Sequence, residues 1–157
     1  MKEVLVAGLG NVLMGDEGVG VRLLRELARG AGRLAHVEFV ELGCGGMKLL
    51  HAMVGRRKVI LLDCARMGQA PGAIRRLRLS EARSRKRRPN LSLHEADLLE
   101  LLALSRRLGE CPEEIVLFAV EPETIRPAEG LSPALRERME QYVRAIMTEL
   151  EETDAEG

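Results

Sequence analysis

The sequence is poor in aromatic residues, with one Tyr, two Phe and no Trp among 157 residues. Aliphatic side chains and Met must therefore build the core, because hydrophobic residues still make up 46% of the chain. Few rings are available to stack on bases, and a formal net charge of zero supplies no overall positive field. Both observations argue against a general nucleic-acid binder.

Long hydrophobic runs and paired cysteines are missing as well. No apolar run is long enough to span a bilayer, and the one at residues 4–9 is too short for a signal-peptide core. We therefore expect a cytoplasmic protein without membrane association. Cys44, Cys64 and Cys111 form no CxxC pair, which is untypical of a disulfide framework or a structural zinc site. GxSxG and HExxH, two standard catalytic motifs, do not occur.

Predicted strands and helices alternate along the chain. Short apolar or alternating runs predict strands at 4–9, 37–41, 58–63, 73–79 and 114–120, the polar fourth run suiting an edge strand. Helical spacing of apolar residues predicts helices at 18–29, 47–54, about 92–108 and 132–150. This order predicts one α/β domain over residues 1–150, with a mainly parallel sheet and helices on both faces. The acidic residues 151–157 are expected to fray.

Acidic residues follow two of the predicted strands. Glu17 comes after the first strand and Asp63 closes the third. If the second and third strands flank the first, a ligand-binding crevice opens at the carboxyl ends of the first and third strands. The acids also have a structural interpretation: Asp16 would cap the start of a helix, Glu17 would favour its positive end, and Asp63 would cap a loop.

His94 is the third candidate, in the first turn of a helix that the capping box Ser92-Leu93-His94-Glu95 predicts. The helix dipole there disfavours the imidazolium, and neutral imidazole is the form that binds metal. Taken alone, an exposed surface histidine is the commoner interpretation. Together with Glu17 and Asp63, it would form an open oxygen and nitrogen site for a divalent transition metal.

Two further features each have a structural and a functional interpretation. Cys44 and Cys64 could lie near this crevice, although small buried residues are the more common explanation for both. The basic run RSRKRR at 83–88 is either a solvated loop or a rim that contacts an acidic protein partner.

Five segments occur in an order that resembles a known family. The opening GLGNVLMGDEGVGV reads as GxGNxLxxDEGxG, Asp63 closes VILLD, and His94 lies in SLHEADL. Glu121-Pro122-Glu123 and Gly130-Leu131-Ser132-Pro133 follow. In these residues the chain resembles the hydrogenase maturation endopeptidases, over almost its whole length to about residue 150. It departs from them in the Gly-rich stretch after the second strand, where Cys44 replaces a usual threonine.

The resemblance implies a fold and an activity. The fold is a three-layer α/β/α sandwich, phosphorylase/hydrolase-like, whose five strands have the order 2-1-3-5-4 with strand 4 antiparallel. The activity is removal of the C-terminal extension from the nickel-loaded precursor of the nickel–iron hydrogenase large subunit, by a monomeric endopeptidase of aspartic or metal-dependent type.

The resemblance also implies roles for particular residues. Glu17, Asp63 and His94 would contact the nickel ion that the substrate supplies, so isolated protein would hold metal only weakly. Asp16 could act as a catalytic acid or base, or only as a helix cap. The loop after the second strand would contact substrate through Gly43, Cys44, Gly45 and Gly46.

Two rival functions come from other classes. Peptidyl-tRNA hydrolases open with a similar strand and turn, but they need a histidine soon after it, and none occurs before His36. A non-catalytic metal chaperone would bind the precursor and leave it uncut.

Overall fold

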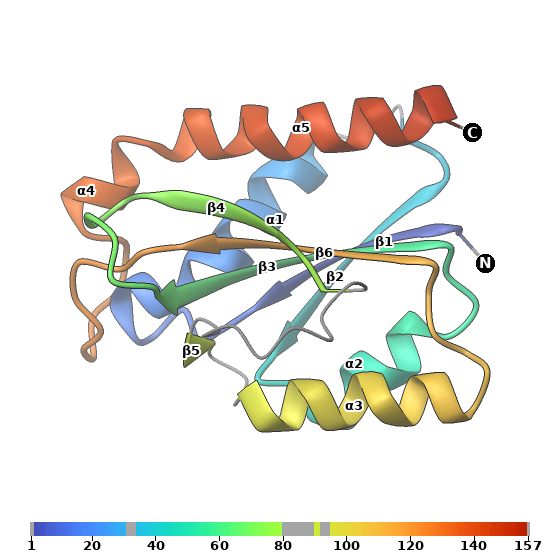
Figure 1. Cartoon of the computed structure of the whole chain (residues 1–157). Helices are drawn as coiled ribbons and strands as arrows, with labels where there is room; N and C mark the ends of the chain where they lie inside the picture. Colours follow the sequence, from blue (N-terminus) through green and yellow to red (C-terminus); the bar gives the residue numbers. More distant parts are fainter. Residues whose placement is uncertain (1, 31–33, 80–89, 92–94, 157) are drawn as a thin grey trace.

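A mixed β-sheet forms the centre of the protein in the computed structural model, which describes residues 2–30, 34–79, 90–91 and 95–156 (Figure 1). Its strands are β1 (Val4–Leu9), β2 (Val37–Gly43), β3 (Lys58–Arg66), β4 (Ile74–Arg78), β5 (Asn90–Leu91) and β6 (Glu114–Val120). The strands are ordered β2-β1-β3-β6-β4, and the two-residue β5 pairs with β3. Leaving β5 out, this order is the predicted 2-1-3-5-4.

Strand directions confirm the predicted topology. β1 is parallel to both β2 and β3, and β3 is parallel to β6, whereas the edge strand β4 is antiparallel to β6. β2 and β3 lie on opposite sides of β1, so the order in which strands are added to the sheet reverses at β1. The carboxyl ends of β1 and β3 therefore lie beside each other at one edge, as predicted for a ligand-binding crevice.

Helices cover both faces of the sheet. They are the 3₁₀ helix η1 (Gly15–Gly18), α1 (Val19–Gly30), α2 (Gly46–Met53), α3 (Glu95–Arg107), α4 (Pro133–Arg136) and α5 (Met139–Glu156). Figure 1 shows α1 and α5 on one face and α2 and α3 on the other. The three-layer α/β/α architecture is thus confirmed. No helix in the described part of the chain is long and apolar enough to cross a membrane.

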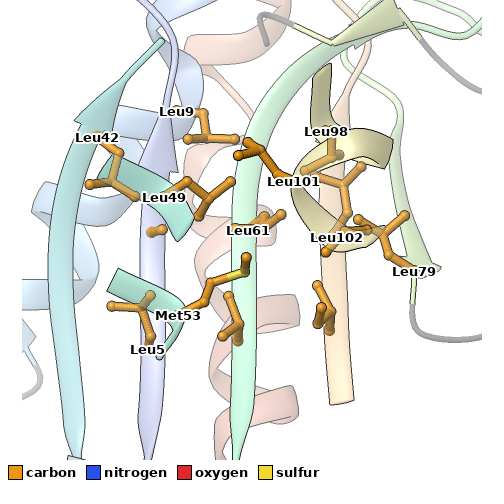
Figure 2. Close-up of a cluster of buried hydrophobic side chains, with 14 of the residues drawn as sticks. Leu5, Leu9, Leu42, Leu49, Met53, Leu61, Leu79, Leu98, Leu101 and Leu102 are labelled. Atoms are coloured by element: carbon orange, nitrogen blue, oxygen red, sulfur yellow. The ribbon is translucent and has the colours of Figure 1, made fainter. Parts of the chain in front are cut away.

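Alternate side chains of the buried strands enter two separate cores. Leu5 and Leu9 of β1 pack with Leu49 and Met53 of α2, in a cluster on the face of the sheet that α2 and α3 cover (Figure 2). Val6 of β1 joins the opposite cluster, with residues of α1 and α5. A period of two with both faces buried explains why the strand sequence is continuously apolar.

Several boundaries differ from the sequence predictions. β3 continues beyond Asp63 to Arg66, and its extension pairs with β5, which was not predicted. The helix expected over 132–150 is two helices, α4 and α5, although no Gly or Pro marks the break at residues 137 and 138. Ser92 and His94 of the capping box lie outside the described residues, as does the basic run 83–88.

The expectation that residues 151–157 fray is wrong for most of that segment, because α5 continues to Glu156. Thr153 is buried, and its hydroxyl oxygen accepts a hydrogen bond of 2.7 Å from Lys58 Nζ at the start of β3. This contact joins residues 95 positions apart, so local sequence pattern could not reveal it.

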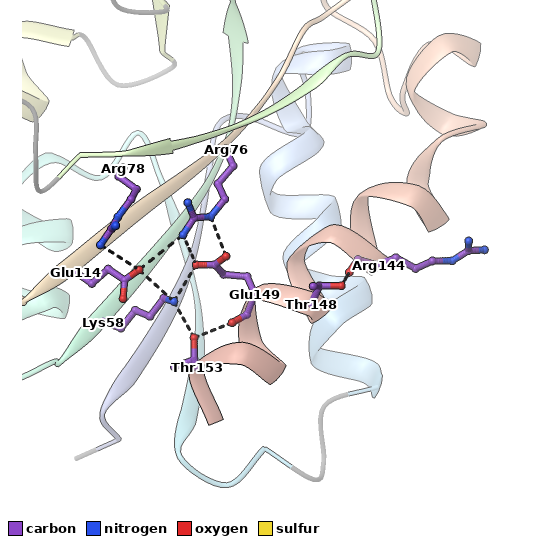
Figure 3. A network of polar contacts seen from close by, with 8 residues as sticks. All are labelled: Lys58, Arg76, Arg78, Glu114, Arg144, Thr148, Glu149 and Thr153. Atoms are coloured by element: carbon purple, nitrogen blue, oxygen red, sulfur yellow. Dashed lines mark hydrogen bonds and ion pairs between the residues drawn. The ribbon is translucent and has the colours of Figure 1, made fainter. Parts of the chain in front are cut away.

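A buried ion pair lies at the same place (Figure 3). Lys58 Nζ donates to Glu149 Oε1 at 2.8 Å, and Arg76 of β4 donates twice to the Glu149 carboxylate, each time at 2.8 Å. Burial raises the pKa of the Glu149 carboxyl, but the hydrogen bonds from Arg76 and Lys58 outweigh it. The net pKa is below its usual value. The charged carboxylate therefore fastens α5 to two strands.

Glu149→Gln should lower the free energy of unfolding by about 3 kcal/mol at pH 7, because the buried Lys58 would keep only the more distant Glu114 carboxylate, at 3.5 Å, as a charged partner. The folded pKa is lowered, so this stabilisation is full above the unfolded carboxyl pKa of about 4.3 and is lost as pH falls through the folded value. Urea unfolding at pH 7 and at lower pH measures the difference, with the exposed Glu151→Gln as a control. A difference that is absent, or constant down to about pH 3, would contradict the assignment.

Candidate functional site

Two glycines allow the turn after β1 to pack closely against the sheet. A Cβ atom on Gly10, whose φ is +106°, would lie 2.0 Å from the carbonyl oxygen of Glu17. A Cβ atom on Gly20 would lie 2.1 Å from the carbonyl oxygen of Leu62 in β3. Any side chain at either position would push η1 and α1 away. These glycines therefore allow η1 to sit directly on the carboxyl edge of β1 and β3.

Asp63 lies on the other side of the same contact. Its side chain is 1% exposed, and its Oδ1 accepts a hydrogen bond of 2.8 Å from the backbone N–H of Cys64. The same oxygen lies 3.7 Å from the position of a Cβ on Gly10. The backbone of the half-buried Glu17 and the carboxylate of Asp63 thus flank Gly10.

Burial and neighbouring acids raise the pKa of the Cys64 thiol. Burial raises its pKa to about 12, with further contributions from the negative charges of Asp63, Asp16 and Glu17. The thiol is therefore neutral at physiological pH in the metal-free protein and is a poor nucleophile there. The three acids concentrate negative charge at this edge, which favours a divalent cation.

Asp16 has a structural role different from the predicted helix cap. Its fully buried carboxylate accepts hydrogen bonds from the backbone N–H groups of Glu123, Thr124 and Ser132, at 2.9, 3.2 and 2.7 Å. The Ser132 hydroxyl donates a fourth, at 2.8 Å. Asp16 thus holds the segment after β6 against η1, immediately beside Glu17.

The Gly-rich loop after β2 adjoins the same edge. The carbonyl oxygen of Gly43 accepts a hydrogen bond of 2.9 Å from the N–H of Gly10, which ties the loop to the turn after β1. Gly43 and Gly46 have φ values of +56° and +33°, which favour glycine. Cys44 is exposed, so its interpretation as a small buried residue is wrong, whereas that of Cys64 is confirmed.

The structure tests only part of the predicted metal set. It places the backbone of Glu17 and the carboxylate of Asp63 on either side of Gly10, but His94 lies outside the described residues. Among the residues that are described, no group of three or more His, Cys, Asp or Glu side chains could hold a metal ion. The described acids alone therefore do not make up a metal site, and the metal contacts of Glu17 and Asp63 stay a prediction.

One buried acid at this edge was not singled out as a site residue. Glu121 directly follows β6, and its Oε1 accepts hydrogen bonds of 2.8 Å from the N–H groups of both Met67 and Gln69. It shapes the loop after β3. The available sequence signal was the one used for Asp63, an acid at the end of a buried apolar run.

A groove of about 520 Å³ lies elsewhere, between β4 and α5, and is lined by Ile74, Arg76, Phe118, Ala145, Thr148, Glu149 and Glu152. Arg76 and Glu149 already bind each other there. The carboxyl edge of β1 and β3, with its acids, is therefore the better candidate site.

Asp16→Asn should lower the free energy of unfolding by about 2 to 3 kcal/mol, because an amide NH₂ would face N–H donors in either orientation. Ser132→Ala removes only the hydroxyl donor and should cost about 1 kcal/mol. Chemical denaturation of both variants and the wild type tests this. Equal stability of Asp16→Asn and wild type would show that these hydrogen bonds do not hold the segment after β6.

Comparisons with known proteins agree with this architecture. Residues 21–149 match the family model for hydrogenase maturation proteases. The hydrogenase 2 maturation protease of Escherichia coli is 32% identical over 155 residues, which cover 98% of this chain and 94% of that protein. The hydrogenase expression/formation protein HupD of Thiocapsa roseopersicina is 31% identical over 87% of this chain and 62% of its own length.

Solved structures show the same fold. The hydrogenase maturating endopeptidase HybD from E. coli superposes with a TM-score of 0.81 at 30% identity, covering 98% of this chain and 94% of that one. A nickel–iron hydrogenase maturation protease from Thermococcus kodakarensis gives 0.70 at 23% identity, over 94% and 98% of the two chains. The family match and the E. coli relative together exclude the peptidyl-tRNA hydrolase alternative. The chain belongs to the hydrogenase maturation protease family.

Proposed function

We propose that this protease removes the C-terminal extension from the precursor of a nickel–iron hydrogenase large subunit, and that it cuts only precursor already loaded with nickel. The nickel ion is part of the substrate. Glu17, Asp63 and His94 would contact it. The observation that supports the proposal is the packing of η1 against β3, in which the backbone carbonyl of Glu17 and the carboxylate of Asp63 both adjoin Gly10.

The chemistry of the two acids supports recognition of an ion already held by the precursor. Carboxylate oxygens suit divalent metals, but two of them without thiolates make a loose site on their own. Such a site would gain most of its affinity when the ion arrives with the precursor's own ligands. Nickel loading would then decide whether the precursor binds productively.

We favour metal-assisted hydrolysis over an aspartic-type mechanism. A bound divalent ion can polarise a peptide carbonyl or activate a water molecule. An aspartic-type mechanism needs two carboxyl groups that share a proton at the reacting centre. Asp16 is poorly suited to this, because N–H and O–H donors already occupy its buried carboxylate. We therefore propose a positioning role for Asp16 and contact with nickel for Glu17 and Asp63.

Several expectations from the sequence stay predictions. They are contact of the precursor with Gly43, Cys44, Gly45 and Gly46, a monomeric state, and a cytoplasmic location. The exposure of Cys44 and the bond between Gly43 and Gly10 support the first, because the loop is both accessible and fixed beside the acids.

Incubating the protein with nickel-loaded and nickel-free precursor, followed by mass spectrometry of the products, tests the proposal. We expect loss of a C-terminal peptide from the loaded form alone. Glu17→Gln should lower the cleavage rate at least about tenfold, since it removes a charged ligand. Glu151→Gln, an exposed acid at the far end of α5, should leave the rate unchanged.

Equal cleavage of both precursor forms would contradict nickel recognition. Binding of the loaded precursor without any cleavage would favour the chaperone alternative instead.

A further inference from the structure

Two large apolar side chains project into solvent at the carboxyl edge of the sheet. Leu13, in the turn between β1 and η1, is 61% exposed. Met47, in the first turn of α2 and directly after the Gly-rich loop, is 54% exposed. Single exposed apolar residues are common on protein surfaces, so exposure alone assigns no function to either. The inference rests on where the two residues lie and on the hydrogen bonds that hold the backbone around them.

The backbone around Leu13 is held from both sides. Its N–H donates a hydrogen bond of 2.9 Å to Asn11 Oδ1, and its carbonyl oxygen accepts one of 3.0 Å from the N–H of Ala128. The N–H of Gly15 donates to the carbonyl oxygen of Ala128, also at 3.0 Å. Leu13 is therefore presented to solvent by a fixed turn, three residues before Asp16.

Met47 belongs to the neighbouring loop. The turn that carries Leu13 and the loop that precedes Met47 follow the paired strands β1 and β2, and the bond from the N–H of Gly10 to the carbonyl oxygen of Gly43 joins them. Both side chains thus extend from backbone that is anchored beside Glu17 and Asp63. Presenting an apolar group in a fixed geometry reduces the entropy lost when a partner binds.

We propose that Leu13 and Met47 form an apolar contact surface for the precursor polypeptide next to the acids. This inference rests on the proposed function for the identity of the partner. The nickel ion would supply a single point of attachment, which does not align a peptide bond. Apolar side chains on the precursor, packed on Leu13 and Met47, would add further points of contact and hold the chain in one orientation. Leu and Met select apolar rather than charged segments.

The test compares Leu13→Ala, Met47→Ala and the conservative Leu13→Met with the matched control Leu108→Ala. Leu108 is 55% exposed and follows α3, before β6 begins, so it lies at the opposite edge of the sheet. Calorimetry measures binding to nickel-free and nickel-loaded precursor, and steady-state cleavage of the loaded form measures KM and kcat.

We expect Leu13→Ala and Met47→Ala each to weaken binding of both precursor forms and to raise KM, by about tenfold for Leu13, with kcat changed less. Leu13→Met should restore most of the affinity, and Leu108→Ala should match the wild type. Unfolding curves that coincide for all variants would show that the fold is kept.

Two outcomes separate this inference from the proposed function. Wild-type affinity and KM in both alanine variants, with cleavage of loaded precursor intact, would overturn the apolar surface and leave nickel-gated cleavage standing. Weaker binding by both variants, in a protein that cuts neither precursor form, would support the surface and overturn the proposed cleavage.

Discussion

The architecture of the site depends on the close approach of the turn after β1 to the sheet. Gly10 and Gly20 let the backbones of η1 and α1 approach β1 and β3 at distances that no Cβ atom could tolerate. That approach brings η1, which carries Asp16 and Glu17, to the carboxyl ends of the strands, where Asp63 lies. The same residues therefore determine both the packing of the first βα unit and the position of the acids.

The fold was largely predictable because its strands are short apolar runs with clear boundaries. The apolar runs in β1, β3 and β6 are continuous, and the charged residues of β4 marked it as an edge strand. The features that were not predicted depend on contacts between residues far apart in the sequence. β5 exists by pairing with the end of β3, and the last turns of α5 are anchored by Lys58. Neither contact leaves a periodic pattern in the local sequence.

The candidate site was predictable to the extent that topology alone determines it. The position of Glu17 and Asp63 at the same edge of the sheet follows from strand order. The role of Asp16 does not, because its partners lie 107 to 116 residues away and are mostly backbone N–H groups, which any residue supplies. The exposure of Cys44 depends on the course of a glycine loop. Gly43 and Gly46 have positive φ values in this loop, but glycine adopts many backbone conformations, so the sequence does not predict the path of the loop.

We propose that Glu17 and Asp63 contact the same nickel ion. A double-mutant cycle with Glu17→Gln, Asp63→Asn and the double variant, measured as affinity for nickel-loaded precursor, tests this most directly. If both carboxylates bind one ion, the double variant should lose far less affinity than the sum of the single losses, with a coupling of about 1 kcal/mol or more. Losses that add to within about 0.5 kcal/mol would show that the two acids act independently, and would contradict a shared nickel contact.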